Sequence, residues 1–168
     1  FDTDFEKHSE EIYTHPEWPE APLFYACCPS VTDPSVAPEG HENIVFLIPI
    51  ASGLEGDTDE LREKYFQIIA KRMEQHLGES ILDAVVYKKM YSVTDFKSDY
   101  NSFQGNAYGL ANTLLQTAIL RPSCKSKKVN NLYYTGQLTV PGPGVPPSLI
   151  SGEVVAKLIE KEFSQRTA

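Results

Sequence analysis

The chain has 168 residues, of which 41% are hydrophobic, so it can bury the core of one domain. Its formal net charge of −8 at pH 7 argues against a nucleic-acid partner. Its apolar runs are too short for a membrane span, and no signal peptide is recognisable. The chain has an odd number of cysteines, Cys27, Cys28 and Cys124, which indicates reduced thiols in the cytoplasm. Their spacing is not that of metal ligands, so no metal site is expected.

The first half of the sequence predicts a short helix, two strands and a longer helix. The short helix is expected near residues 5–12, and residues 23–28 and 44–50 are predicted as strands. Asp57 is predicted to cap the next helix, which ends near Gly78. The apolar residues of that helix recur at helical spacing and are expected to face the core: Leu61, Tyr65, Ile68, Ile69 and Leu77.

The part of the sequence that follows predicts shorter elements. Residues 81–91 are predicted as a strand, and Thr94 is expected to cap a short helix over residues 95–100. Residues 113–120 are predicted as a short apolar helix that Pro122 stops. Together with a C-terminal strand and helix, these elements indicate an α+β fold.

A loop rich in glycine and proline separates a predicted strand at residues 131–135 from the last helix. Its glycines can adopt φ > 0 and have no Cβ, so a ligand can approach the main chain at Gly136, Gly142 and Gly144. Pro147 is expected to open the helix, whose free N–H groups at Ser148 and Leu149 would favour a partial negative charge. The alternative is a structural turn. The buried face of the helix is expected to carry Ile150, Val154, Leu158 and Ile159.

The loop and its flanks match a long motif. A strand N-L-Y-Φ-x-G, where Φ is apolar, leads into T-x-P-G-x-G-Φ-P and a helix with a small residue one turn in. The matching residues are Asn131, Leu132, Tyr133, Tyr134, Gly136, Thr139, Pro141, Gly142, Gly144, Val145, Pro146 and Ser151. This segment resembles the C-terminal flavin-contacting motif of the phytoene desaturase family, which includes carotenoid desaturases and isomerases. The sequence departs from that motif at Gln137, Leu138, Val140 and Pro147.

Two further blocks extend the resemblance over most of the chain. Residues 23–50 are similar to the family's strand–PSxTDPSxAPEG–strand block. Residues 93–122 are similar to its segment with TxxDF, a glycine-aromatic-glycine turn, Q-[ST]-A and a closing R-P. In the second block, Asp95 is interpreted first as a helix-start residue and Arg121 as a structural ion-pair partner, with a role in the site as the alternative for each.

The resemblance implies the domain organisation. Residues 1–124 would be a portion of a sheet-and-helix substrate domain, and residues 125–168 the C-terminal strand–loop–helix of a Rossmann-like FAD-binding domain. The chain would be a C-terminal portion of a longer enzyme, because it lacks the G-x-G-x-x-G motif that binds the ADP part of FAD.

The resemblance also implies an FAD-dependent oxidoreductase that desaturates a long polyene by hydride transfer to flavin. The residues implied to contact FAD are Gly136, Gln137, Pro141, Gly142, Gly144, Val145 and Pro146. The substrate would be a hydrophobic carotenoid. The side chains suggested to line its site, each with a core role as the alternative, are Phe46, Phe103, Tyr108 and Leu114. No nucleophile–base pair or carboxylate pair is recognisable, so no catalytic residue is named.

Two other functions remain open from the sequence. One is a carotenoid cis–trans isomerase of the same superfamily, which uses reduced flavin without net oxidation. The other is a non-catalytic module that binds an apolar ligand or a partner. Family members act on polyenes dissolved in membranes, so a cytoplasmic location with peripheral membrane contact is expected. The chain by itself is expected neither to hold FAD stably nor to convert carotenoid.

Overall fold

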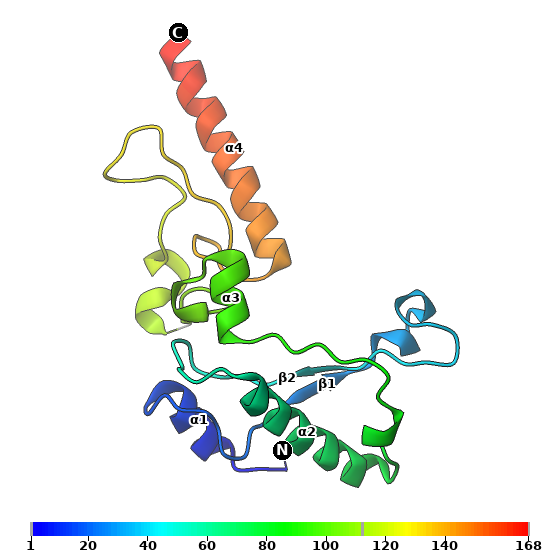
Figure 1. The fold of residues 1–168 in the computed structure, drawn as a ribbon. Helices are drawn as coiled ribbons and strands as arrows, with labels where there is room; N and C mark the ends of the chain where they lie inside the picture. Colours follow the sequence, from blue (N-terminus) through cyan, green and yellow to red (C-terminus); the bar gives the residue numbers. More distant parts are fainter. Residues whose placement is uncertain (1, 112, 168) are drawn as a thin grey trace. The chain divides into compact units, whose positions relative to one another are not determined.

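The computed structural model describes residues 2–111 and 113–167, and it divides into two compact units, Phe1–Asn106 and Ala107–Ala168. Figure 1 traces the chain from the short N-terminal helix to the long C-terminal helix. The assignment of residues 1–124 and 125–168 to two domains of a longer enzyme stays a prediction, as does the fold class that depends on it.

Three helices organise the first unit. Helix α1 (Phe5–Tyr13) begins after Asp4, whose side chain accepts hydrogen bonds from the first-turn amides. Helix α2 (Asp59–Leu77) ends at Gly78, a left-handed residue with φ of 74°, which confirms its predicted end. Helix α3 (Val93–Tyr100) follows.

The predicted N-caps of α2 and α3 were wrong by one or two residues. Thr58, not Asp57, caps α2 by accepting a hydrogen bond from the Leu61 amide. Ser92, not Thr94, caps α3, and Asp95 completes its capping box, which confirms the helix-start role expected of Asp95. The side chains of Asp57 and Thr94 bind each other instead.

The sheet of the first unit is a two-stranded antiparallel ribbon. Strands β1 (Tyr25–Cys27) and β2 (Val45–Leu47) pair with Ala26 opposite Phe46. The predicted strand at residues 81–91 was wrong, because the structure has a 3₁₀ turn at Leu82–Ala84 and no strand in the rest of that segment. A β-rich sequence forms a strand only where another strand is available to pair with it.

The core of the first unit forms where α1 and α2 meet the segments that flank the ribbon. Tyr65 and Ile69 of α2 are buried, as predicted, whereas Leu77 is 56% exposed. His8 is 2% exposed, and its Nδ1 atom accepts the Leu23 amide, so its Nε2–H donates to the Pro49 carbonyl 2.9 Å away. These two hydrogen bonds fix α1 to the chain before β1 and after β2.

Helix α4 (Val145–Thr167) dominates the second unit. The strand predicted at residues 131–135 is reduced to one antiparallel bridge, between Lys125 and Tyr133. The helix predicted at residues 113–120 is replaced by two 3₁₀ turns, Leu114–Gln116 and Ala118–Leu120. On α4 the buried residue is Ser151, while Ile150 and Val154, which were predicted to be buried, are 49% and 37% exposed.

Candidate functional site

The candidate site is the glycine–proline loop at residues 136–147, which leads directly into α4. Gly136, Gly142 and Gly144 have φ values of 106°, 138° and 108°, in the region that L-residues with side chains rarely adopt. A Cβ at Gly136 would meet nothing within 4 Å, and one at Gly144 would meet only the Pro147 ring, at 3.5 Å. The main chain of the loop therefore borders open space at these two glycines.

Ser151 fastens the start of this loop to α4. Its side chain is fully buried, and its Oγ accepts a 2.7 Å hydrogen bond from the Gly136 amide while donating to the Ser148 carbonyl. The Thr135 hydroxyl also lies 2.7 Å from this oxygen. A small residue at this position was part of the predicted motif, but its role as an anchor was not foreseen.

The middle of the loop is held by its own hydrogen bonds and by the segment before it. Thr139 is 3% exposed, and both its amide and its hydroxyl donate to the Gly136 carbonyl. The Val140 amide donates to the Pro122 carbonyl at 3.1 Å, and the Cys124 thiol lies 3.5 Å from the Val140 carbonyl. The loop is thus shaped before any ligand arrives, which lowers the entropic cost of binding.

The start of α4 offers fewer donors than the sequence predicted. The helix begins at Val145 rather than Pro147, and the Ser148 amide, which was predicted to be free, donates to the Gly144 carbonyl at 3.0 Å. Pro146 and Pro147 have no N–H to contribute. The positive end of the helix dipole still lies next to the loop, so it favours a partial negative charge there.

The seven residues suggested as FAD contacts therefore lie on a single loop of the second unit. Gly142 is buried, Gln137 is half-buried, and Pro141, Gly144, Val145 and Pro146 are exposed. Leu138, one of the departures from the motif, lies against Gly109, where a Cβ would be 2.6 Å from a Leu138 methyl group. This contact was missed, although the glycine-aromatic-glycine turn was a usable signal for it.

The suggested substrate-lining residues are divided between the two units, two in each. Phe46 packs edge-to-face on Phe24 in the first unit, where Phe103 is 79% exposed. Tyr108 and Leu114, in the second unit, are 62% and 87% exposed. A groove of about 360 Å³ on the first unit contains none of them and is lined by Phe66, Gln67, Leu82, Val85, Val86, Tyr87 and Lys88.

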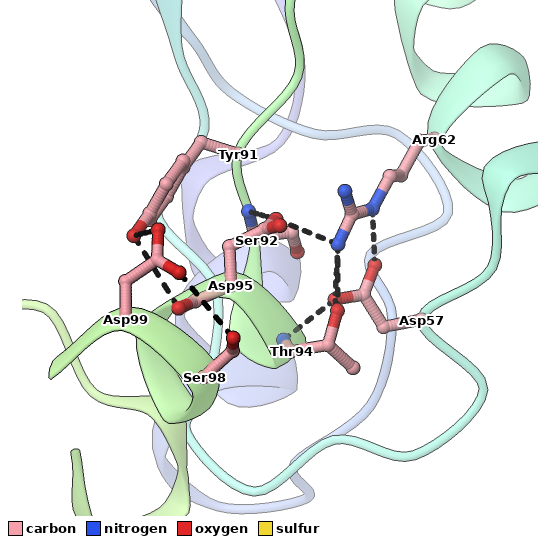
Figure 2. Close-up of polar contacts among 8 residues, drawn as sticks. All are labelled: Asp57, Arg62, Tyr91, Ser92, Thr94, Asp95, Ser98 and Asp99. Atoms are coloured by element: carbon pink, nitrogen blue, oxygen red, sulfur yellow. Dashed lines mark hydrogen bonds and ion pairs between the residues drawn. The ribbon is translucent and has the colours of Figure 1, made fainter. Parts of the chain in front are cut away.

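A polar network in the first unit joins the start of α2 to the start of α3 (Figure 2). Arg62 donates to both carboxylate oxygens of Asp57, at 2.7 and 2.9 Å, and lies 2.7 Å from Asp95. The amide and hydroxyl of Thr94 donate to Asp57 as well. These hydrogen bonds, chiefly from Arg62, hold the pKa of Asp57 well below its ordinary value. The arrangement is a structural clamp between the two helix starts.

The same network continues along α3 to Tyr91. The Tyr91 hydroxyl donates to Asp99 at 2.7 Å, and desolvation together with this carboxylate raises the pKa of Tyr91. Among residues 2–111 and 113–167, no group of three or more His, Cys, Asp or Glu side chains is arranged to hold a metal ion.

Comparison with known proteins identifies the family. No protein-family model matches the chain. A carotenoid 3,4-desaturase of Haloarcula japonica is 45% identical over 162 residues, which are 96% of this chain and 32% of that protein. The chain is homologous to carotenoid and phytoene desaturases over nearly its whole length.

Two other relatives, one named as a dehydrogenase and one as a desaturase, support this assignment. A 4,4'-diapolycopen-4-al dehydrogenase of Metabacillus indicus is 34% identical over 98% of the chain and 33% of the relative. A neurosporene-forming phytoene desaturase of Rhodobacter capsulatus is 32% identical over 92% of the chain and 30% of the relative. The predicted family is thereby confirmed, and this desaturase homologue spans about a third of the length of the curated relatives it matches.

Proposed function

We propose that this chain is the C-terminal part of an FAD-dependent carotenoid desaturase and that its loop at residues 136–147 forms the isoalloxazine-side wall of the flavin site. One observation carries the proposal. In a homologue of carotenoid desaturases, a glycine loop that Ser151 anchors to α4 leaves its main chain open at Gly136 and Gly144.

The residues present fit a flavin ring. The open main chain gives a flat group room to lie against the loop, and the N-terminal end of α4 favours the negative charge that a reduced flavin carries near N1 and the C2 carbonyl. FAD would supply the hydride acceptor. The loop would hold the ring in place and exclude water from one face, and other residues of the longer protein would bind the ADP part.

The substrate in this proposal is a hydrophobic carotenoid. The family names of the relatives describe oxidation, as desaturases or a dehydrogenase, which favours desaturation over isomerisation for this chain. Exposed Phe103, Tyr108 and Leu114 would contact the polyene only once the longer protein is complete. In this proposal the contact with the membrane is peripheral, as expected for an enzyme whose substrate dissolves in the bilayer. No helix within the described ranges is long and apolar enough to cross a bilayer.

The central test is the flavin content of the longer enzyme with Gly144→Val. Among the described residues, a Cβ at Gly144 would have only the Pro147 ring within 4 Å, so the bulk of a valine would project into the space assigned to the flavin ring. The purified variant is expected to lose its FAD absorbance. Gly40→Val is the matched control, because Gly40 has φ of 74° and open surroundings in the first unit. Equal flavin content in both variants would contradict the proposed site.

The reaction itself is tested by product analysis after expression of the longer enzyme with a source of phytoene. A desaturase gives products with additional double bonds, whereas an isomerase gives geometric isomers of unchanged composition. The 168-residue chain alone is expected to purify without stoichiometric FAD, because it supplies one wall of the site.

A further inference from the structure

Arg121 lies buried directly behind the loop that the proposed function assigns to flavin. The residue is 5% exposed, although arginine is rarely buried to this extent. A Cβ built on Gly142 would be 3.4 Å from Arg121 Nε and 3.7 Å from Cζ. The guanidinium group therefore packs against the side of Gly142 on which a Cβ would lie.

The segment that carries Arg121 is bound to the same loop and to the turn before it. Arg121 Nη2 donates to the Leu110 carbonyl at 3.4 Å. The next residue, Pro122, accepts the Val140 amide through its carbonyl, and the Cys124 thiol lies against the Val140 carbonyl. The position of the charge relative to Gly142 is thus fixed by main-chain contacts on both sides.

A guanidinium group stays protonated under all ordinary conditions, and its charge acts over a longer range where water is excluded. Arg121 places a fixed positive charge on one side of Gly142. This charge favours negative charge on a group that lies against the opposite side of the loop, where the proposed function places flavin. It would add to the field of the α4 N-terminus, where two of the first three residues are prolines without an N–H.

We propose that Arg121 is a positioning residue of the flavin site, whose bulk supports Gly142 and whose charge makes the site bind reduced flavin more tightly than oxidised flavin. This inference rests on the proposed function, because it requires FAD in front of the loop. It takes up the site role that the sequence left open for Arg121 as the alternative to a structural ion-pair role.

The test compares Arg121→Lys and Arg121→Met in the longer enzyme with FAD bound. The midpoint potential of the bound FAD, its dissociation constant and the melting temperature of the apoprotein are measured for each variant. Arg121→Met is expected to lower the preference for reduced over oxidised flavin about tenfold, or ~30 mV for a two-electron couple. Arg121→Lys, which keeps the charge, is expected to retain the wild-type potential even if FAD binds more weakly.

Lys157→Met is the control for charge in the same unit. The Lys157 side chain is 70% exposed and pairs with Glu153, so solvent screens its charge and the potential is expected to stay unchanged. If Arg121→Met does not fold, Arg121→Gln takes its place, because an amide can still donate to Leu110.

Three outcomes overturn the inference in distinguishable ways. Equal shifts in the Lys and Met variants would show that the shape of the side chain, not its charge, is what matters. An unchanged potential together with lost FAD affinity would reduce Arg121 to structural support. A wild-type enzyme that binds no FAD would instead refute the proposed function, and this inference with it.

Discussion

In the first unit, Asp57 and Arg62 bury their charges against each other, whereas in the second unit apolar side chains stand at the surface. The Asp57 side chain is 1% exposed and that of Arg62 is 14% exposed. In the second unit, Ile119 is 93% exposed, Leu114 87% and Leu149 71%. Apolar side chains are exposed in the first unit too, with Phe103 at 79% and Val86 at 78%. The first unit thus differs by the ion pair that it buries between its helices, while the second exposes apolar side chains along α4, where proteins usually cover such surface at an interface.

The largest expected effect is the loss of the clamp in the first unit. Asp57→Ala would leave Arg62 with Asp95 as its remaining carboxylate and Thr94 without its acceptor, so the expected cost lies at the lower end of the range for a broken buried ion pair, about 3 kcal/mol of unfolding free energy. Trp18, the single tryptophan, packs on Tyr65 in this unit, so its fluorescence during urea unfolding reports the change. Asp59→Ala, at an exposed position on α2, is the control and should cost about 0.5 kcal/mol. If Asp57→Ala and Asp59→Ala lost equal amounts of unfolding free energy, the ion pair between Asp57 and Arg62 would contribute no more to stability than an exposed charge does.

The second prediction concerns the close approach of Gly105 to α3. A Cβ at Gly105 would lie 2.4 Å from the Val93 carbonyl oxygen, and Val93 is 2% exposed, so neither group can yield easily. Gly105→Ala is expected to cost about 3 kcal/mol through clash and strain. Gly56→Ala has the same left-handed φ but open surroundings, and should cost only about 1 kcal/mol. The difference in unfolding free energy between the two variants is measured by Trp18 fluorescence. It would vanish if Gly105 did not lie against the Val93 carbonyl of α3.

Local sequence signals predicted the bounds of α2 and α4 better than those of the strands, although the helix predicted at residues 113–120 was wrong. Helix α2 carries its own stop signal at Gly78, and the loop before α4 carries its glycines and prolines, so both could be recognised from adjacent residues. A strand depends on a partner that adjacent residues do not reveal, and residues 81–91 have none within the described chain. The anchoring by Ser151 and the burial of Arg121 could not be predicted from neighbouring residues either, because both depend on residues more than ten positions away.

The third prediction concerns the loss of unfolding free energy of the first unit at alkaline pH. Burial raises the pKa of Tyr65 to about 12, and its hydroxyl donates to the Pro19 carbonyl at 2.7 Å. Because the pKa of Tyr65 is raised in the folded state, its contribution to the unfolding free energy is complete below the ordinary pKa of 10.0. That contribution is lost as the pH rises toward about 12. The loss should reach about 2 kcal/mol at the upper end. Tyr65→Phe should show a flatter decline than the wild type, and parallel declines would contradict a buried, neutral Tyr65.

The smallest effects test whether the two faces of α4 differ as described. Ser151→Ala removes the acceptor of the Gly136 amide, and an unsatisfied buried donor costs about 1 kcal/mol or more. Hydrogen exchange at the Gly136 amide should therefore become faster. Leu149→Gln changes a 71% exposed side chain on the same helix and should leave that exchange rate and the stability of the chain unaltered within about 0.5 kcal/mol. If Leu149→Gln were as damaging as Ser151→Ala, the open face of α4 would be packed within this chain, and the contrast between the two units would fail.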